Sequence, residues 1–542
     1  MSTTNLDFLK VGGLFPPSTE LERLAKYKRY DDLFYSRISE AYSSYIDKAN
    51  KMGQTMVDQL GTIFNNPRIM NYARAITKKT VDLALSRKPY VISNKSDNEI
   101  DLLEIEHGTS IWKKTRQGLT DVSRYGQSYI REYNKIPRYL KDNNGKVEMT
   151  AGQPACNAIN PSMVVEIVNP LDREDVQQFV IGWVDKVETA TRPDVITTEY
   201  YLTVEIHKIG SYQIRRFRVG DPVLNYGLVK QFNIIEEVTA EDLAGKDIPT
   251  GLDGFAIKKL MNYTTTDNPS EGLSDYDMLD TLMIELVQRV SQLSQVFTKH
   301  GDPAMQGSAE LLSTDENGNP VFYTGDFYPI GKDEQPLSYI TWNSQSKEII
   351  EYCNQILQNI WILTEMGDGT IMGYVRDNKG FADSGKALRM RLASPLMKVQ
   401  GLLVDNQETI VSILLDFAKI LGKDLKRSDI EIKWQDGLPV DNLEEANIFQ
   451  ARVTSGTESV VFGLQRRYNM TPEQAQKEFE QILKEKKDAF ENTQVIQFNE
   501  QSGQNNLTNN KKGNNSKNEA IKSREQEERS SDAKNSAGPS KK

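Results

Sequence analysis

The side chains best suited to chemistry in this sequence are a group of three carboxylates, two cysteines and three histidines. Asp275, Asp277 and Asp280 are close enough in sequence to be considered as metal ligands. They also directly precede a helical pattern of apolar residues, and acidic side chains are favoured at the positive end of a helix dipole. We therefore interpret them as residues of a helix start rather than as a metal site. Cys156 and Cys353 are interpreted as ordinary thiols.

The sequence lacks the motifs that mark common catalytic sites. Gly-Lys pairs occur, but none is followed by Ser or Thr in the GxxxxGK[ST] pattern that cradles phosphates. HExxH, GxSxG and CxxC are also absent. With only two cysteines, and with His107, His207 and His300 as the three histidines, little material remains for metal or redox chemistry. We predict a non-enzyme with no cofactor, no metal and no catalytic residues.

Charge and hydropathy argue against tight binding to nucleic acid and against a membrane partner. The net charge of -10 over 542 residues argues against a broad basic surface that grips nucleic acid. No run of about 18 apolar residues exists, and the N-terminal residues lack the pattern of a signal peptide, so we expect no membrane association. Four basic residues nevertheless lie close together, and they are either a salt-bridged helix face or a contact for a polyanion; these residues are Lys386, Arg389, Arg391 and Lys398.

The elements that would position these residues indicate an α+β fold that is mainly helical. Three helices are predicted before about Tyr133, over Leu24–Ile46, Ile69–Leu85 and Ile111–Tyr125. Five segments rich in Val, Ile, Tyr and Thr then predict an antiparallel meander. These segments are Ser128–Tyr133, Met163–Val168, Val176–Val184, Thr197–Ile206 and Tyr212–Val219.

Two amphipathic helices with a short β-rich insertion between them predict a helical hairpin. The first helix would begin at Ser274 as N-cap and run to Lys299, and the second would cover Ser346–Leu363. Each helix has one apolar stripe, which is satisfied either inside one chain or by copies packed around a symmetry axis. The sequence pattern leaves these two possibilities open. The stripe residues are Leu279, Leu282, Leu286, Val290, Leu293, Phe297, Ile349, Cys353, Ile356 and Ile360.

The chain after the hairpin predicts a long loop, a long helix, a strand and a polar tail. The loop Thr364–Asp383 is glycine-rich and charged, and loops of this length are usually functional. The helical pattern Ser384–Leu421 contains Pro395, which should kink or restart it. Residues 430–434 alternate as a strand, and further helices follow. The polar composition of residues 492–542 predicts a disordered tail.

Four segments, in this order, resemble the portal proteins of tailed double-stranded DNA bacteriophages. Asn71–Ile76, continuing to Arg87-Lys88-Pro89, looks like an early helix of that family followed by its "KP" turn. Arg124–Ile130 is similar to its "YG" step into a strand. Gly272–Tyr276 looks like the opening of its first stem helix, and Ser384–Leu392 with Pro395-Leu396 is similar to the start of the long helix after its tunnel loop.

The resemblance implies a division of the chain into the parts of a portal subunit. The stem would comprise residues 271–300 and 346–363, with the clip at 301–345 between them and the tunnel loop at 364–383 after them. The other parts would be an N-terminal arm at 1–24, a wing at 25–270 with the strand 428–438, a long wing helix at 384–427, a crown at 439–491 and the tail at 492–542.

The resemblance also implies a function in the virion. Such subunits, assembled in the host cytoplasm, form a homo-oligomeric ring of about twelve copies at one capsid vertex. The ring nucleates procapsid assembly and passes DNA during packaging and ejection. The implied partners are other copies of the chain, the terminase large subunit, a head-tail adaptor, the major capsid and scaffolding proteins, and double-stranded DNA in transient, non-specific contact.

The resemblance assigns roles to two sets of residues and leaves two alternatives. The apolar stripes of the stem would pack subunits together, and a set of basic side chains would face the DNA channel: Arg376, Lys379, Lys386, Arg389 and Arg391. A conduit should touch phosphates only weakly, since tight counterion-release binding would stall sliding. The alternatives are another phage minor head or connector ring protein and, from a different class, a nucleic-acid-processing enzyme.

Overall fold

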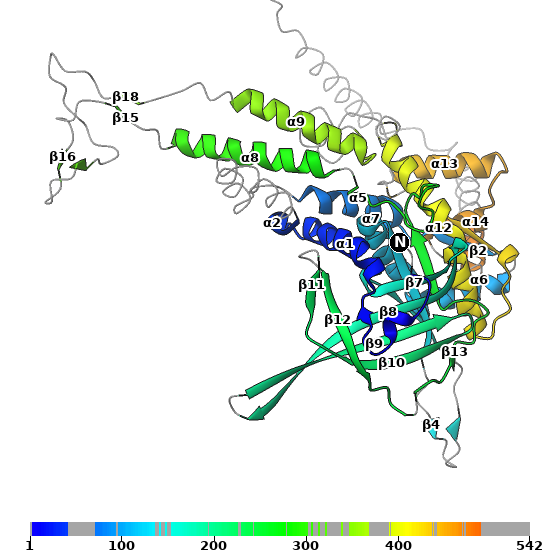
Figure 1. The fold of residues 1–542 in the computed structure, drawn as a ribbon. Helices are drawn as coiled ribbons and strands as arrows, with labels where there is room; N and C mark the ends of the chain where they lie inside the picture. The colour runs from blue at the N-terminus through cyan, green and yellow to red at the C-terminus, as the bar shows by residue number, and fades with distance from the viewer. Residues whose placement is uncertain are drawn as a thin grey trace, which may run out of the picture. The chain divides into compact units, whose positions relative to one another are not determined.

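The computed structural model of the chain combines antiparallel sheets with helices, as the predicted α+β class requires (Figure 1). Two units are distinguished, Met1–Glu445 and Ala446–Lys542, and each is described by itself. The structure describes residues 3–41, 71–93, 96–135, 140–141, 147–148, 153–192, 195–225, 229–241, 243–277, 279–301, 305–306, 313–314, 320–321, 338–339, 346–367, 390, 392–435, 437, 442–468, 470 and 473–488.

The largest sheet of the first unit is the predicted antiparallel meander. Its strands lie in the order β1-β12-β10-β9-β8-β7, and β11 and β13 pair at its margins. Apolar side chains that alternate along these strands pack against one another to form one of the cores. The strands are β1 (Leu14–Phe15), β7 (Val164–Asn169), β8 (Asp172–Arg192), β9 (Val195–Lys208), β10 (Ser211–Val219), β11 (Val223–Asn225), β12 (Val229–Glu237) and β13 (Ile248–Pro249).

The N-terminal residues join this sheet. β1 pairs with β12, and Thr3 forms an isolated bridge to Ile167 on β7. Short 3-10 turns at Asp7–Leu9 and Ser18–Glu20 lead from there into helix α1 (Leu21–Phe34). The residues predicted as an N-terminal arm thus contribute an edge strand to the largest sheet.

A second, three-stranded sheet contains β3 (Gln127–Lys135) between β14 (Ile257–Met261) and β6 (Gln153–Ile159). The prediction that Ser128–Tyr133 belongs to the meander is therefore wrong, although its strand character is correct. Helix α12 (Ala393–Ile420) and the helices before β3 cover this sheet and share the largest core with it. These helices are α5 (Tyr72–Leu85), α6 (Ser96–Thr109) and α7 (Ile111–Tyr125).

Both predicted ends hold for one of the three early helices, and the predicted C-terminal end holds for a second, α5, which begins at Tyr72 rather than Ile69. α7 has the predicted ends and stops at Gly126, whose φ of +87° suits glycine. α5 starts after Asn71, whose Oδ1 accepts a hydrogen bond from the Arg74 backbone N–H at 2.8 Å. The continuous helix predicted over Leu24–Ile46 is wrong, because α1 ends at Phe34 and Ser36 has a φ of +60° before the short helix α2 (Ile38–Ala41).

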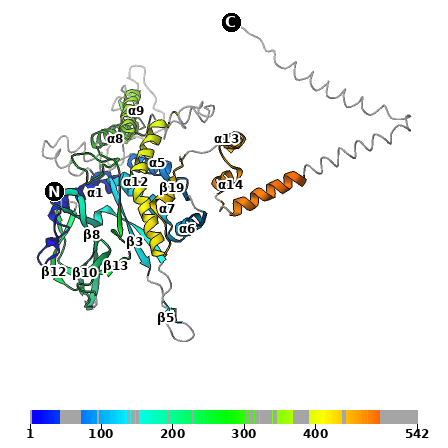
Figure 2. The same cartoon turned by 90° about the vertical axis from the view of Figure 1, so that its right-hand side faces the viewer.

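The predicted hairpin consists of α8 (Asp280–Gly301) and α9 (Ser346–Leu363), which lie side by side in both views (Figures 1 and 2). α9 has the predicted bounds. α8 starts six residues later than predicted, because Ser274–Asp277 forms a separate turn. Between the helices, short antiparallel pairs agree with the predicted β-rich insertion: β15 (Met305–Gln306) with β18 (Ser338–Tyr339), and β16 (Ser313–Thr314) with β17 (Pro320–Val321).

The long helix α12 (Ala393–Ile420) contains Pro395 in its first turn. Proline is tolerated there, since the first backbone N–H groups of a helix have no partner within the helix. Pro395 therefore opens α12 rather than kinking it. After α12, the predicted strand appears as β19 (Ile430–Lys433), which pairs with β2 (Tyr90–Ser93). A further small pair joins β4 (Leu140–Lys141) to β5 (Val147–Glu148).

The second unit contains the last predicted helices. α13 (Asn442–Thr454) crosses the boundary between the units, and α14 (Val460–Tyr468) and helical residues 473–488 follow. Gly463 lies directly on the ring of Phe449, where a Cβ atom would approach a ring carbon to 1.9 Å. The predicted tail, residues 492–542, lies outside the described residues.

Glu132 on β3 gives the first unit a testable pH dependence. Its side chain is buried beside Asp416 and Lys258, and burial, reinforced by the Asp416 carboxylate, raises the pKa of Glu132 well above its usual value. A carboxyl whose pKa is higher in the folded state stabilises most below its unfolded pKa, and stability falls as the pH rises through the folded pKa. We expect Glu132→Gln to raise the melting temperature by about 2 °C or more at pH 8, with the gain vanishing towards pH 4.

Thermal unfolding across this pH range measures the effect of Glu132→Gln, and Glu174→Gln, at an exposed position, is the matched control. An equal or lower melting temperature for Glu132→Gln at pH 8 would contradict the prediction.

Candidate functional site at the base of the helical hairpin

Two of the segments that carry the resemblance touch through their glycines. A Cβ atom at Gly126 would lie 1.9 Å from the carbonyl oxygen of Gly272, and one at Gly272 would lie 2.0 Å from the carbonyl oxygen of Gly126. The Gly126 carbonyl also accepts the backbone N–H of Asn262 at 2.8 Å. Only glycine allows two backbones to approach so closely. The "YG" step and the start of the hairpin thus form one contact.

Asp275 is the centre of a buried polar network beside this contact. Its backbone N–H donates to the Ser123 carbonyl at 2.9 Å, and its carboxylate accepts the Ser123 hydroxyl at 2.5 Å. Asn262 Nδ2 donates to the same carboxylate at 3.1 Å, and Lys398 Nζ lies 2.8 Å from Oδ1. Since a buried charge is costly without partners, this network fixes the turn before α8 against α7 and α12.

Tyr276 fixes the same turn against α5. Its hydroxyl donates to the Ala73 carbonyl at 3.0 Å and lies 2.6 Å from the Thr77 hydroxyl. Its ring packs edge-on against Tyr30 of α1, with centroids 5.8 Å apart. The first resembling segment, which begins at Asn71, therefore also meets the base of the hairpin.

The other two carboxylates of the group diverge to different partners. Asp277 Oδ2 accepts the Ser274 backbone N–H at 2.8 Å, while Oδ1 lies 3.0 Å from Lys26 Nζ and accepts the Tyr30 hydroxyl. Asp280 pairs with Arg29 of α1 at 3.0 Å, and burial raises the pKa of Asp280. Among the residues that the structure describes, no group of three or more metal-ligating side chains is placed to hold an ion. The interpretation as helix-start residues is correct for Asp280, in the first turn of α8, whereas Asp275 and Asp277 belong to the separate turn that precedes the helix.

The apolar stripe of the hairpin is divided between a buried base and an exposed tip. Near the base it packs on α1, α2 and α5 of its own chain, in one core. For these residues the structure supports the first of the two possibilities, a stripe satisfied inside one chain, because the body of the same chain covers it. The residues of that core are Leu279, Leu286, Cys353, Ile356 and Ile360, which are buried, and Leu282, Val290 and Ile349, which are partly buried.

The tip of the hairpin keeps apolar side chains at the surface. Phe297 is 56% exposed, Ile350 is 42% exposed, and Leu293 is of intermediate burial. Of the ten stripe residues, Leu293 and Phe297 are the ones outside the core at the base. Packing between subunits stays a prediction for these two.

The basic residues predicted to face a channel lie outside the described residues; they are Arg376, Lys379, Lys386, Arg389 and Arg391. The structure does describe both ends of that region, Thr364–Gly367 and α12. Lys398, the fourth member of the predicted basic face, forms an ion pair with Asp275, so for this residue the salt-bridge interpretation holds. No local sequence pattern predicted this ion pair, because Lys398 and Asp275 are far apart in sequence.

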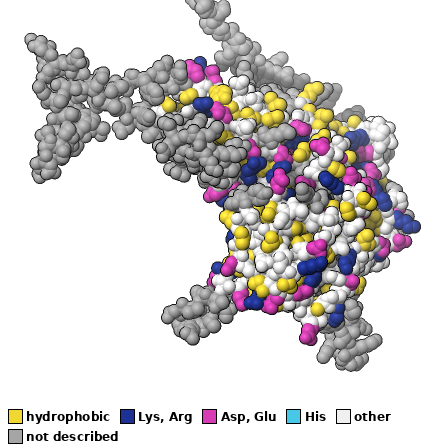
Figure 3. Space-filling view, in the orientation of Figure 1, with side chains coloured by type: hydrophobic (Ala, Val, Ile, Leu, Met, Phe, Trp, Pro, Cys, Tyr) yellow, Lys and Arg dark blue, Asp and Glu magenta, His cyan; other side chains and the backbone are white. Residues whose placement is uncertain are grey.

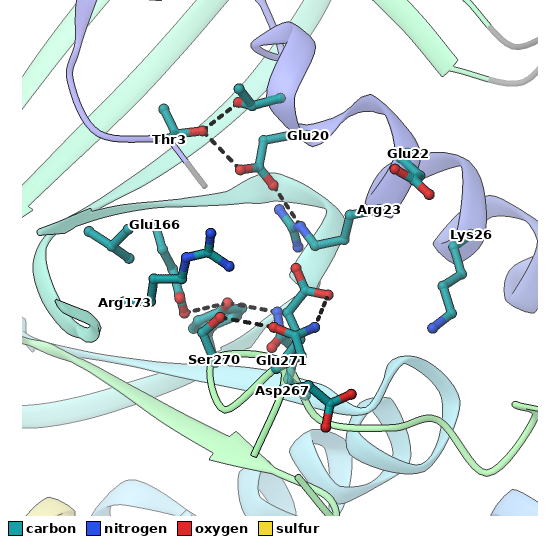
Figure 4. A pocket seen from close by; sticks show the side chains of 15 residues that line it. Thr3, Glu20, Glu22, Arg23, Lys26, Glu166, Arg173, Asp267, Ser270 and Glu271 are labelled. Carbon is teal, nitrogen blue, oxygen red and sulfur yellow. Dashed lines mark hydrogen bonds and ion pairs between the residues drawn. The ribbon is translucent and has the colours of Figure 1, made fainter. Parts of the chain in front are cut away.

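A cavity of about 350 Å³ lies between the N-terminal segment, α1 and the sheets (Figure 4). Its lining carries both charge signs, and several of these groups are paired with each other. Thr3 Oγ1 donates to Glu20 Oε1 at 2.9 Å, and Glu20 Oε2 accepts from Arg23 Nε at 2.7 Å. The described surface likewise has basic and acidic side chains interspersed on the face seen in Figure 3. Neither feature resembles a broad basic surface for nucleic acid.

Comparison with known proteins gives the family. None of the described helices is long and apolar enough to cross a bilayer. No individual curated protein matches the chain. Residues 24–492 match the family described as "Phage portal protein, SPP1 Gp6-like", and this range includes all the contacts at the base of the hairpin. The chain therefore belongs to the SPP1 Gp6-like family of phage portal proteins and is a portal protein of a tailed phage.

Proposed function

We propose that the chain forms a homo-oligomeric ring whose central channel passes double-stranded DNA at one capsid vertex, during packaging and again during ejection. The family is a structural one rather than a family of enzymes, and it implies a ring associated with the capsid. The observation that carries the proposal is the match of residues 24–492 to the portal family. Within this range the chain has a helical hairpin with a β-rich insertion, followed by a long helix.

The geometry of the hairpin supports this role. A shared apolar core holds the base of α8 and α9 on the wing, together with ion pairs of Asp280 in α8 and of Asp275 and Asp277 in the preceding turn, while the tip keeps Phe297 and Ile350 exposed. A hairpin anchored at one end can present its free faces to neighbouring copies around an axis. We propose that the stem tips meet in this way, and that the crown, the tunnel loop and the clip have the positions that the family pattern implies.

The partners follow from the same assignment. We propose that residues 301–345 dock the terminase large subunit during packaging and a head-tail adaptor afterwards. Contacts of the ring with the major capsid and scaffolding proteins would nucleate procapsid assembly in the host cytoplasm. DNA would touch the channel transiently and without base readout, since the chain is acidic overall.

Size measurement and negative-stain imaging of the purified protein test the proposed ring. We expect annular particles with a central hole and a mass of about twelve chains. A compact monomer at every concentration would remove the proposal. A ring without a hole wide enough for a duplex would favour a different connector protein, and nuclease or ATPase activity of the purified protein would favour the enzyme alternative.

Reversing the charge of Arg376 and Lys379 tests the contact with DNA. We expect the double variant Arg376→Glu with Lys379→Glu to form normal rings but to package or retain less DNA, because repeated cations at a narrow ring touch phosphates as they pass. Particle yield and encapsidated DNA are the measurements. The matched control is Lys10→Glu, at an exposed position of the N-terminal segment. Normal packaging by the double variant would exclude the assigned contact.

A further inference from the structure

One lysine contacts both ends of the helical hairpin. Lys398 Nζ lies 2.8 Å from Asp275 Oδ1, in the turn that precedes α8, and donates to the Thr364 carbonyl, directly after α9, at 2.9 Å. Its side chain is 12% exposed, and that of Asp275 is 3% exposed. The ammonium group therefore joins three segments that are far apart in sequence, and water has little access to it.

The segment after α9 is held in a defined conformation at this contact. The Thr364 and Met366 backbone N–H groups donate to the carbonyls of Ile360 and Trp361 at 3.0 and 2.9 Å. Glu365 has a φ of +58°, which is uncommon for a residue with a side chain, and its carbonyl accepts the Ser394 hydroxyl at 3.2 Å. The first two turns of α12 thus supply both Ser394 and Lys398 to the end of the hairpin.

The turn that precedes α8 is held through the side chain of Asp275. Ser123 and Asn262 donate to the Asp275 carboxylate, so neutral groups of the wing satisfy part of it. Lys398 is the cation that balances its charge. Without that cation the carboxylate would be buried with its charge unpaired, which strongly disfavours the packed arrangement.

We propose that Lys398 is a positioning residue that pins both ends of the hairpin to α12 and so sets the orientation of the stem relative to the wing. The inference rests on the proposed function in one respect, namely that stem orientation matters because it would set the width of a channel. The pinning itself concerns one chain and does not require a ring.

Hydrogen exchange of the purified full-length protein tests the pinning. In Lys398→Met, which keeps the aliphatic side chain and removes the charge, we expect the amides of Asp275, Thr364 and Met366 to exchange at least about tenfold faster. Amides in the middle of α12 should keep their protection. The matched control is Lys419→Met on the same helix, because Lys419 pairs with Asp253 at the surface, with side-chain exposures of 45% and 93%. That variant should exchange like the wild type.

Three results would overturn the assignment: unchanged exchange at both ends, faster exchange at only one end, or a uniform rise throughout the first unit. If Lys398→Met does not fold, Asp275→Asn serves in its place. It should loosen the Asp275 end while the amides of Thr364 and Met366 keep their protection, and loss of protection at both ends would contradict the pinning. Imaging of the same samples reports ring formation independently, so loosened ends in a protein that forms no ring would support the pin and refute the channel.

Discussion

Replacing Gly126 with alanine should prevent the first unit from folding stably. The new Cβ atom would lie 1.9 Å from the Gly272 carbonyl oxygen, and the φ of +87° already disfavours any side chain. Neither backbone can move freely, because hydrogen bonds hold both segments next to the contact. The Asn262 N–H donates to the Gly126 carbonyl, and the Asp275 N–H donates to the Ser123 carbonyl. We expect a loss on the order of 4 kcal/mol or more, seen as little soluble protein or a strongly lowered melting temperature.

The control for this prediction is Gly422→Ala. Gly422 has a similar φ of +71°, but no atom lies within 4 Å of the position that a Cβ would take. This variant should lose only about 1–2 kcal/mol, which is the cost of the backbone conformation alone. Similar losses at both positions would show that the contact with Gly272 contributes nothing, and that conformation alone explains Gly126.

Replacing Leu286 and Phe297 should separate the two halves of the hairpin stripe. Leu286 is fully buried in the core that α8 and α9 share with α1, α2 and α5, so Leu286→Ala should lower the unfolding free energy by about 2–5 kcal/mol. Phe297 is 56% exposed, so Phe297→Ser should leave the stability of one chain within about 0.5 kcal/mol of the wild type. It should reduce the fraction of protein assembled into rings.

Thermal or urea unfolding at low concentration measures the first effect, and size measurement over a concentration series measures the second. A stable Leu286→Ala protein would mean that the base of the stem is not anchored in its own chain. Unchanged assembly of Phe297→Ser would remove the tip from the proposed subunit interface and leave assembly to other surfaces.

The local patterns of the sequence predicted many elements with accurate ends. α7 runs from Ile111 to Tyr125 as predicted, because an amphipathic repeat meets a glycine at its end. α9 has the predicted bounds for a comparable reason, since its apolar stripe is uninterrupted. The strands β7 to β10 were also predictable, because β-branched and aromatic residues alternate between turn residues.

Predictions failed where distant parts of the chain decide. Ser274–Asp277 has the composition of a helix start, yet contacts with Ser123 and Ala73 hold it as a separate turn, and α8 begins at Asp280. For Pro395 the sequence left a kink and a restart open, and α12 begins just before it, as a restart requires. The pairing of β3 in a second sheet was also missed. Its partners β14 and β6 were not among the predicted strands, and β14 lies far from β3 in sequence.

The sequence by itself determined the α+β class, the approximate positions of many helices and strands and the order of segments that resembles portal proteins, because periodicity, capping and turn residues act within a few positions of the chain. The tertiary structure alone decided that Gly126 meets Gly272, that Lys398 pairs with Asp275, and that the base of the hairpin is buried while Phe297 is exposed. These features depend on which surfaces meet when the chain packs. A backbone contact or a buried ion pair between segments far apart in sequence leaves no local pattern to read.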